Sequence, residues 1–412
     1  MNTAVEPAGA VGMNARRLER ISPAMQAYVD RGVYAGISTL IARGGAVVHA
    51  GQYGWRDKEA GAAMTADTVF RLYSMTKPII CVGLMTLLEE GRLRLIDPLA
   101  KYIPAFGGVK VLEADGSLVA PNRPIMIRDL MTHMSGLSYH FVEEGGVGKM
   151  YADAKLLGAH HSLEAAIDDL ARFPLAFQPG TKWRYSVGID VAARVIEVIS
   201  GRPLGVFLGE RLFEPLGMSD TAFGVAPEKQ GRVAAMYGRP DLLTAGPTMM
   251  SEFAAWMNGV NDRIDVSKTY PVDAPDVFMR GGHGLFSTIG DYFRFAQMLA
   301  NGGELGGERV IGRKTLELMH ANHVPASLLP LEIGGLPVAG YGFGLGSRVL
   351  LDVAQSGAPG SVGEFGWSGA AKTHYWVDPK EQIVGLFMTQ SMMSFDLPEF
   401  DLRALAYQAI ED

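Results

Sequence analysis

The chain contains little of what marks several classes of protein. Its single cysteine, Cys81, excludes a disulfide framework within one chain and lies in an apolar stretch typical of a core helix. The net charge is −7 and no block of Lys and Arg stands out, so nucleic acid is not an expected partner. The longest apolar runs fall well short of the ~20 residues that span a bilayer, so no membrane association is expected either.

The first residues also lack the features of an export signal. Residues 1–12 contain no Lys or Arg and no Leu, Ile or Phe, and the first positive side chains are Arg16 and Arg17. A secretory signal needs a basic segment followed by an apolar one. If Met1 is the native start, we expect a cytoplasmic protein.

What is present describes a globular protein. The chain has 412 residues, of which 48% are hydrophobic and 20% charged, enough for two or three structural units with a large core. Strand periodicity occurs near both ends, with predicted hairpins at 36–50, 109–120 and 375–388. Helical periodicity predicts helices at 16–29, 79–90, 127–134, 163–173, 189–200, 204–213 and 399–410, and one from about residue 289.

This distribution predicts an α+β fold. We expect an antiparallel sheet assembled from N- and C-terminal segments and flanked by helices, plus a mainly helical insertion domain. The predicted sheet domain comprises 1–73 and 285–412, and the predicted helical domain comprises 74–284. The Gly- and Pro-containing stretch 324–346 is expected to be loop or short strand at the surface.

A possible nucleophile lies where the most apolar helix begins. Ser74-Met75-Thr76-Lys77 precedes that helix, and residues three apart on a helix face the same way, so Lys77 should lie over the Ser74 hydroxyl. Serine needs a neighbouring base, and a lysine can serve when burial or a nearby positive charge favours its neutral form. Alone the motif is weak, because a helix N-cap serine with a solvated lysine has the same spacing.

Three further segments strengthen the interpretation. Residues 177–186 place Tyr185 just before a predicted helix, after a Pro-Gly turn. Residues 281–288 form a glycine-rich approach to another helix. Residues 365–370, Phe-Gly-Trp-Ser-Gly-Ala, precede the C-terminal hairpin, and their small residues would let a strand come close to a bound substrate.

Together the four motifs resemble the serine β-lactamase and penicillin-binding protein superfamily, which combines Ser-x-x-Lys, a second Ser- or Tyr-led motif and a Lys-Thr-Gly-type strand. The chain looks most like the class C β-lactamase branch and, more closely, the family VIII carboxylesterases. The resemblance runs from about Ala35 to Leu405. Residues 129–137 and 213–218 also resemble scaffold segments of that branch.

The resemblance implies roles for individual residues. It makes Ser74 the nucleophile and Lys77 its helix lysine, while Tyr185 shares the base role and later protonates the leaving group. The oxyanion hole would be the backbone N–H groups of Ser74 and of Ala370 on an edge strand. This acyl transfer implies no metal and no organic cofactor.

Departures from the family pattern concern substrate binding. Class C enzymes have Tyr-x-Asn, whereas Val187 replaces the amide here, and Trp367 stands where the third motif normally has lysine. The missing groups bind the amide and carboxylate of penicillins and stem peptides, so a neutral ester is favoured as substrate. Candidate substrate-binding residues are therefore Trp367, Ser368, Gly369, His283 and Val187. Two alternatives stay open: Lys372-Thr373 as a displaced third motif, and a structural role for His283.

Other residues invite rival interpretations. Gly366 to Ala370 nearly matches the α/β-hydrolase elbow, which would make Ser368 the nucleophile. His133 and Ser135 are two apart and should not face each other on a helix, so His133 is expected to pack at a helix end. His160 and His161 lack nearby acidic or Cys ligands and are expected in a solvated turn. Five aromatic residues are candidates for an acyl pocket or for plain core: Tyr139, Phe141, Trp183, Trp256 and Trp376.

These observations leave three hypotheses for function. The first is a serine carboxylesterase that acts through an acyl-enzyme on short-chain or neutral esters, with weak β-lactam hydrolysis as a side activity. The second is an acyltransferase on the same scaffold, in which an alcohol replaces water. The third is a non-enzymatic ligand-binding or sensor protein. The sequence is silent on oligomeric state.

Overall fold

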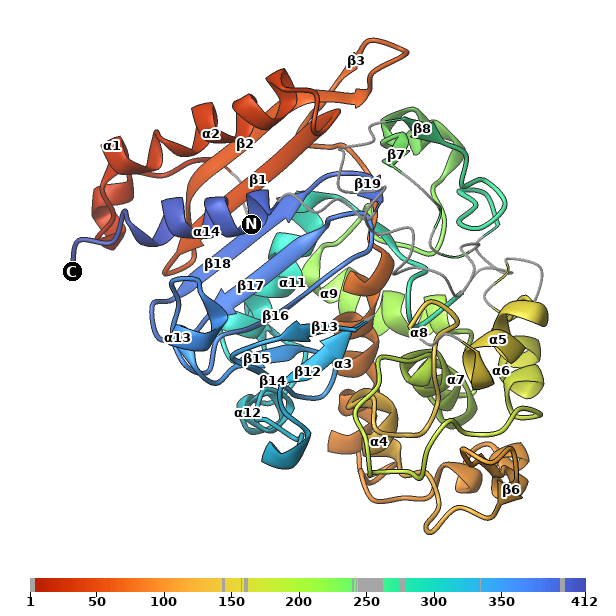
Figure 1. The fold of residues 1–412 in the computed structure, drawn as a ribbon. Coiled ribbons are helices and arrows are strands. Elements are labelled where there is room, and N and C mark those ends of the chain that lie inside the picture. The colour runs from red at the N-terminus through yellow and green to blue at the C-terminus, as the bar shows by residue number, and fades with distance from the viewer. Residues whose placement is uncertain are drawn as a thin grey trace.

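An antiparallel sheet drawn from both ends of the chain forms one half of the molecule (Figure 1). The computed structural model describes residues 4–142, 145–156, 158, 162–238, 241, 243, 262–274, 279–333, 335–392 and 397–412. Over these residues the sheet has eight strands in the order β14-β15-β16-β17-β18-β1-β2-β3. Their bounds are β1 Gly36–Arg43, β2 Ala46–Asp57, β3 Ala62–Ala63, β14 Tyr341–Phe343, β15 Arg348–Leu350, β16 Phe365–Ser368, β17 His374–Asp378 and β18 Ile383–Met388.

The two ends of the chain meet at the centre of this sheet. Strand β1 pairs with β18 from Ser38 opposite Met388 to Arg43 opposite Ile383. On its other side β1 pairs with β2 through a two-residue turn, in which Gly44 and Gly45 both have positive φ. Such a turn matches the twist of antiparallel strands and favours glycine at both positions. The predicted joining of N- and C-terminal segments in one sheet is confirmed.

Helices cover both faces of the sheet. On one face lie α1 (Ala15–Leu18), α2 (Ile21–Asp30) and α14 (Pro398–Tyr407), which enclose a core that includes Trp376 and Phe387. On the other face α11 (Ile289–Ala300) packs against β17, β18 and β1. Because both faces are covered, every residue of β17 and β18 is buried.

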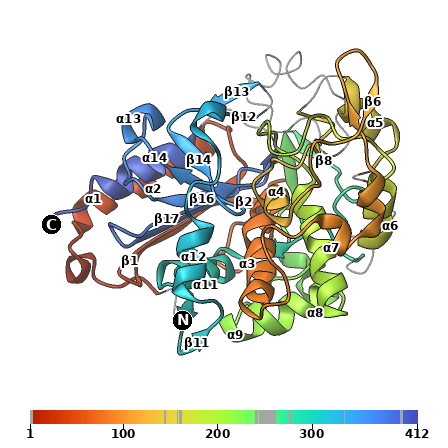
Figure 2. The ribbon, with the colours of Figure 1, turned by 90° about the horizontal axis from the view of Figure 1, so that it is seen from below.

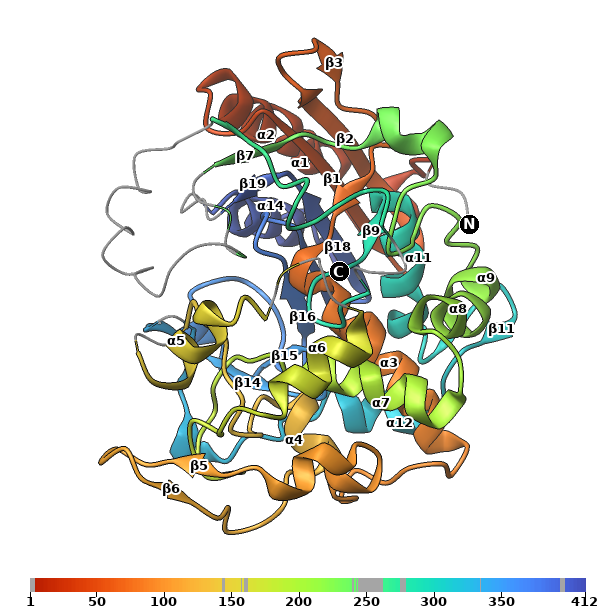
Figure 3. The same cartoon turned by 90° about the vertical axis from the view of Figure 1, so that its right-hand side faces the viewer.

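The helical half lies on the other side of α3 (Thr76–Glu89). Figure 2 shows α3 between the sheet and the helices of residues 146–208, and Figure 3 shows those helices from their own side. Twelve of its residues are buried, since it contacts both halves of the molecule. The surrounding helices are α4 Ile127–Met131, α5 Gly146–Asp153, α6 Leu163–Leu170, α7 Gly188–Ser200, α8 Leu204–Leu208, the π-helical η5 Gly209–Phe213 and α9 Glu214–Leu216. No helix among the described residues has the length and apolarity that a membrane crossing requires.

Short elements complete the fold. Small sheets pair β4 (Phe70–Arg71) with β9 (Phe286–Ser287), and β7 (Met236–Gly238) with β8 (Arg263–Ile264) and β19 (Ser391–Met392). Two-stranded hairpins are β5 Val111–Leu112 with β6 Leu118–Val119, β10 Glu304–Leu305 with β11 Glu308–Arg309, and β12 Leu331–Ile333 with β13 Leu336–Val338. The remaining helices are α12 Arg313–Met319, α13 Val353–Ser356, η1 Ala8–Val11, η2 Tyr73–Met75, η3 Leu99–Lys101, η4 Pro104–Gly108, η6 Pro227–Arg232 and η7 Ala326–Leu328.

The fold class is as predicted, whereas three local expectations were wrong. The predicted helix 16–29 is divided between α1 and α2, and α4 ends at Met131 instead of residue 134. Stretch 324–346 does not lie wholly at the surface, because β14 is buried and joins the main sheet. The division into domains at residues 74 and 285 stays a prediction.

Candidate active site

Ser74 lies in the tight turn η2, immediately before α3. Its neighbour Tyr73 has φ +47, a left-handed conformation that residues other than glycine adopt rarely. Two contacts hold the turn: the Tyr73 ring packs on Tyr270 with centroids 4.9 Å apart, and the Tyr292 hydroxyl donates to the Met75 carbonyl oxygen (2.9 Å). The tertiary structure therefore holds the serine on a constrained turn, a feature common at functional sites.

Lys77 makes the contact that the Ser-x-x-Lys spacing predicts. Its Nζ lies 3.1 Å from the Ser74 Oγ and donates to the Gly282 carbonyl oxygen at 2.8 Å. The side chain is only 1% exposed. Its Nζ also lies over the rings of Tyr185 and Tyr139, 4.7 and 5.2 Å from their centroids. A buried amine that is already held beside a serine hydroxyl is well placed to exchange a proton with that hydroxyl.

His133 holds the loop that carries Tyr185. The Arg184 N–H donates to the His133 carbonyl oxygen (2.9 Å), and the Ser186 N–H donates to the His133 Nδ1 (3.3 Å). The rings of His133 and Tyr185 have centroids 4.7 Å apart. Burial, then the charge of Lys77, holds the pKa of His133 well below its usual value. The imidazole therefore stays neutral, as an Nδ1 acceptor must.

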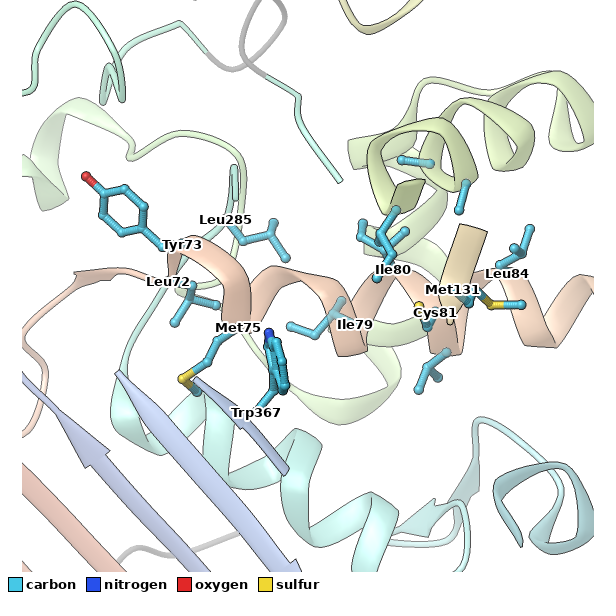
Figure 4. Packing of buried hydrophobic residues seen from close by; sticks show 14 of the residues in the cluster. Leu72, Tyr73, Met75, Ile79, Ile80, Cys81, Leu84, Met131, Leu285 and Trp367 are labelled. Carbon is cyan, nitrogen blue, oxygen red and sulfur yellow. The ribbon is translucent and has the colours of Figure 1, made fainter. Parts of the chain in front are cut away.

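Trp367, on β16, lies beside Tyr185. Figure 4 shows its indole directed toward the start of α3. Its ring lies 5.6 Å from that of Tyr185 and 5.0 Å from that of Phe343. Lys372, the alternative third-motif residue, instead pairs with Glu399 of α14, with 2.8 Å between Nζ and Oε1. The structure thus brings Trp367 beside Tyr185 and holds Lys372 in an ion pair elsewhere.

The strand that carries Trp367 is not at the edge of the sheet, contrary to expectation. β16 lies between β15 and β17. However, β15 pairs with it only at Phe365 and Gly366, whereas β17 pairs as far as Ser368. On the β15 side, the described ladder therefore ends before Trp367, which leaves room for the turn that carries Ser74.

Gly369 permits close contact between the end of this strand and the turn that carries Ser74. A Cβ there would lie 2.2 Å from the Leu72 carbonyl oxygen and 2.3 Å from the Thr373 Oγ1. Thr373 in turn donates to that Leu72 oxygen at 3.1 Å. Within the described part of the chain, the N–H of the next residue, Ala370, donates to no backbone carbonyl oxygen. Its place in an oxyanion hole with the Ser74 N–H stays a prediction.

Replacing Gly369 with alanine should separate the two halves of the site. The methyl group would overlap backbone, which cannot move aside cheaply, so β16 must shift away from Leu72. We expect a loss of about 100-fold in kcat, as for a displacement of about 1 Å in a catalytic constellation. Steady-state kinetics measures the loss, and Gly108→Ala is a control because its backbone has no positive φ and nothing lies within 4 Å of a Cβ there. Wild-type kcat in a folded Gly369→Ala variant would contradict the prediction.

The remaining candidates have more varied surroundings. Val187 is buried in the core at the start of α7, and its N–H donates to the Ser138 carbonyl oxygen (3.3 Å). His283 is buried, and burial, then Lys77, holds its pKa well below the usual value. Trp376 belongs to the core under α14 on the opposite face of the sheet, so it lines no pocket at Ser74. Trp256, His160 and His161 lie outside the described residues.

Sequence reasoning missed Asp190 and the part that Gly282 plays. Asp190 is buried in the first turn of α7, and its Oδ1 accepts from the Gly282 N–H at 2.9 Å. The run Gly281-Gly282-His283-Gly284 was the available signal, because such a run indicates backbone that packs closely against something. The groups it contacts come from helices distant in the chain, which the sequence does not reveal. Among the described residues, no three ligand-type side chains group as a metal site.

Comparison with known proteins agrees with this geometry. A family model described as Beta-lactamase matches residues 21–409. Protein Rv1367c of Mycobacterium tuberculosis is 34% identical over 371 residues, 88% of this chain and 87% of that protein. Esterase EstB of Burkholderia gladioli is 30% identical over 362 residues, 86% of each chain.

A solved structure extends the comparison to the fold. The structure of EstCE1, described as a hydrolase with promiscuous acyltransferase activity, superposes with a TM-score of 0.78 at 27% identity, and covers 95% of this chain and 99% of that one. The family match and the solved structure both extend through the sheet and the helical half. On this evidence the chain belongs to the Beta-lactamase family and has its fold.

Proposed function

We propose that the protein is a serine carboxylesterase that hydrolyses neutral esters through an acyl-enzyme. The observation that carries the proposal is the contact of 3.1 Å between the Ser74 Oγ and the buried Lys77 Nζ, with the Tyr185 ring beside the same amine. A nucleophile and a base within hydrogen-bond reach are what acyl transfer from a serine requires. A binding or sensor protein would not require a buried lysine amine beside the Ser74 hydroxyl.

The reaction follows from these groups. The Ser74 Oγ attacks the ester carbonyl carbon while its proton passes to the Lys77 and Tyr185 pair. The backbone N–H groups of Ser74 and Ala370 would stabilise the oxyanion. When the intermediate collapses, the pair returns the proton to the alkoxide, which leaves as an alcohol. Water then attacks the acyl-enzyme and gives a proton to the same pair. The pair passes that proton to the Ser74 Oγ as the acid is released.

The site favours a neutral substrate. Trp367 occupies the position beside Tyr185, and Lys372 is engaged with Glu399. Rings of Trp183, Phe343 and Tyr139 extend the aromatic surroundings of Tyr185 and His133. An aromatic wall binds apolar acyl or aryl groups, whereas a substrate carboxylate would lose its hydration without gaining a cation. These neutral groups support a carboxylesterase of the family VIII type.

An acyltransferase is the second candidate. It needs the same acyl-enzyme but an alcohol as acceptor, and a site walled by aromatic rings disfavours water. EstCE1 is described as a hydrolase with promiscuous acyltransferase activity, so both reactions are attributed to that one protein. We therefore propose hydrolysis as the main reaction and transfer as the competing one.

The proposal is tested with p-nitrophenyl esters of graded chain length, with nitrocefin as the β-lactam. Esters should be hydrolysed and nitrocefin should react weakly. Adding a primary alcohol should divert part of the acyl group to a new ester. A phosphonate ester should add one label, and peptide mapping should place it on Ser74. Label on Ser135 or Ser368 instead, or no ester turnover, would refute the proposal.

Trp367→Lys should change selectivity more than chemistry. A cation there would attract a carboxylate-bearing β-lactam, while loss of the indole would weaken binding of aryl esters. We expect the ratio of kcat/KM for the β-lactam to kcat/KM for a neutral ester to rise several-fold, a gain that shrinks with added salt.

Trp367→Met is the matched control, since it also removes the indole but adds no charge. A rise of the same size in both variants would mean that the charge is irrelevant. An unchanged ratio in a folded, active Trp367→Lys variant would mean that Trp367 does not face the substrate.

A further inference from the structure

A buried carboxyl group that the proposed reaction does not use lies behind the lysine. Asp190, in the first turn of α7, is 3% exposed. Its Oδ1 accepts from the Gly282 N–H at 2.9 Å, and its Oδ2 accepts from the Tyr139 hydroxyl at 3.5 Å. A buried carboxylate is costly unless hydrogen bonds and charges compensate it. Its place beside the nucleophile therefore needs an explanation.

Gly282 links this carboxyl group to the lysine. Its N–H donates to Asp190, and its carbonyl oxygen accepts from the Lys77 Nζ at 2.8 Å. The fit allows no side chain: a Cβ on Gly282 would lie 2.5 Å from the Asp190 Oδ2 and 2.6 Å from the Tyr139 hydroxyl oxygen. A Cβ on Gly281 would lie 2.4 Å from the Ile189 carbonyl oxygen. The glycine-rich segment is thus packed onto the first turn of α7.

Asp190 and Lys77 lie among groups that are mostly uncharged. Burial raises the pKa of Asp190, whereas the positive charges of Lys77 and Arg280 oppose that rise. Other titratable groups among the described residues that interact with Lys77 include Tyr139, Tyr185, His133, His283 and Cys81. Burial raises the pKa of Tyr139 and of Cys81 and lowers that of both histidines, so these four stay neutral near pH 7. Asp190 is the one carboxyl group in this set.

We propose that Asp190 is a positioning residue for Lys77. It fixes the Gly282 carbonyl oxygen against the amine, and its carboxylate stabilises the ammonium that forms when Ser74 gives up its proton. This inference rests on the proposed function and adds no covalent step to it. The proton still passes from the Ser74 Oγ to the lysine and tyrosine pair, and Asp190 keeps its own charge throughout.

The test measures how fast a phosphonate ester labels Ser74 as a function of pH. Asp190→Asn keeps an acceptor for the Gly282 N–H but removes the charge. The Lys77 ammonium is then less favoured, so the acid limb of the rate profile should shift to lower pH by about one unit. Asp190→Ala also removes the acceptor and should slow labelling about 100-fold across the profile. Gly282→Ala, which disturbs the link from the other side, should slow it similarly.

Asp291→Asn is the matched control. Asp291 also lies buried in the first turn of a helix, α11, where it accepts from the Asp220 N–H and the Thr221 hydroxyl, and burial raises its pKa too. This variant should lose thermal stability without moving the acid limb.

The inference is overturned if the limb stays in place in folded Asp190→Asn or moves equally in Asp291→Asn. Should Asp190→Asn not fold, wild-type labelling of a folded Gly282→Ala variant overturns it equally. Failure of the proposed function is a separate result, since the wild-type protein would then not be labelled at Ser74 at all.

Discussion

Ser74→Ala is expected to lower kcat for ester hydrolysis by about 10⁵- to 10⁶-fold, the loss typical when the serine of a serine hydrolase is removed. The substitution deletes the attacking oxygen and leaves the lysine without its partner at 3.1 Å. Little else changes, because the main chain of Tyr73 to Met75 and its contacts with Tyr292 do not involve this hydroxyl. The thermal unfolding midpoint should therefore stay near that of the wild type.

Ser135→Ala provides the comparison for this loss. Ser135 is fully buried and its Oγ accepts from the Leu137 N–H at 3.3 Å, so the change should cost stability but little kcat. Intact-mass measurement after phosphonate treatment should show one adduct on wild type and Ser135→Ala and none on Ser74→Ala. Retained turnover in Ser74→Ala would move the nucleophile to another residue.

Lys77→Met and Tyr185→Phe should each lower kcat by about three orders of magnitude, and the double variant should lose hardly more than either alone. The Lys77 Nζ lies over the Tyr185 ring, and both groups surround one proton. Members of one proton-transfer unit are far from additive, because losing either disables the unit. Methionine suits position 77 because the side chain is 1% exposed and must fill the same space.

The double-mutant cycle needs the four kcat values at the plateau of the pH profile and a phosphonate titration of active sites. A double variant that loses the full product of the two single losses would show that the residues act separately. Tyr407→Phe is the control for loss of a tyrosine hydroxyl, because Tyr407 lies in α14 on the opposite face of the sheet, where its hydroxyl donates to Asp378.

Local sequence patterns predicted most of the fold and the contact between Ser74 and Lys77 for physical reasons. Ser74 and Lys77 are three residues apart, so helical geometry alone brings their side chains together. The hairpin at Gly44-Gly45 follows from its turn residues, and the C-terminal strands follow from two short, largely apolar runs on either side of a turn. The sheet that joins β1 to β18 could be inferred because the strand patterns occur at both ends of the chain.

What could not be predicted depends on contacts between distant segments. The apposition of Gly282 with both Asp190 and Lys77 joins three segments whose register no local pattern specifies. The expectation that His133 does not pair with Ser135 agrees with the structure. Its hydrogen bonds to the residues on either side of Tyr185 were not expected, because they depend on a left-handed backbone at His133, φ +58. The position of β16 within the sheet was also missed, because the strand order is set by segments from elsewhere in the chain.

The pairing of β1 with β18 has a consequence for how the protein is made. β1 is translated early and soon pairs with β2, but its other edge has no neighbour until residues 383–388 have left the ribosome. An unpaired edge is a template for other chains, and pairings between distant segments slow folding. The nascent chain therefore carries an open sheet edge while the residues between β2 and β18 are being made. A chaperone that shields this edge until residues 383–388 are available should raise the yield of soluble protein.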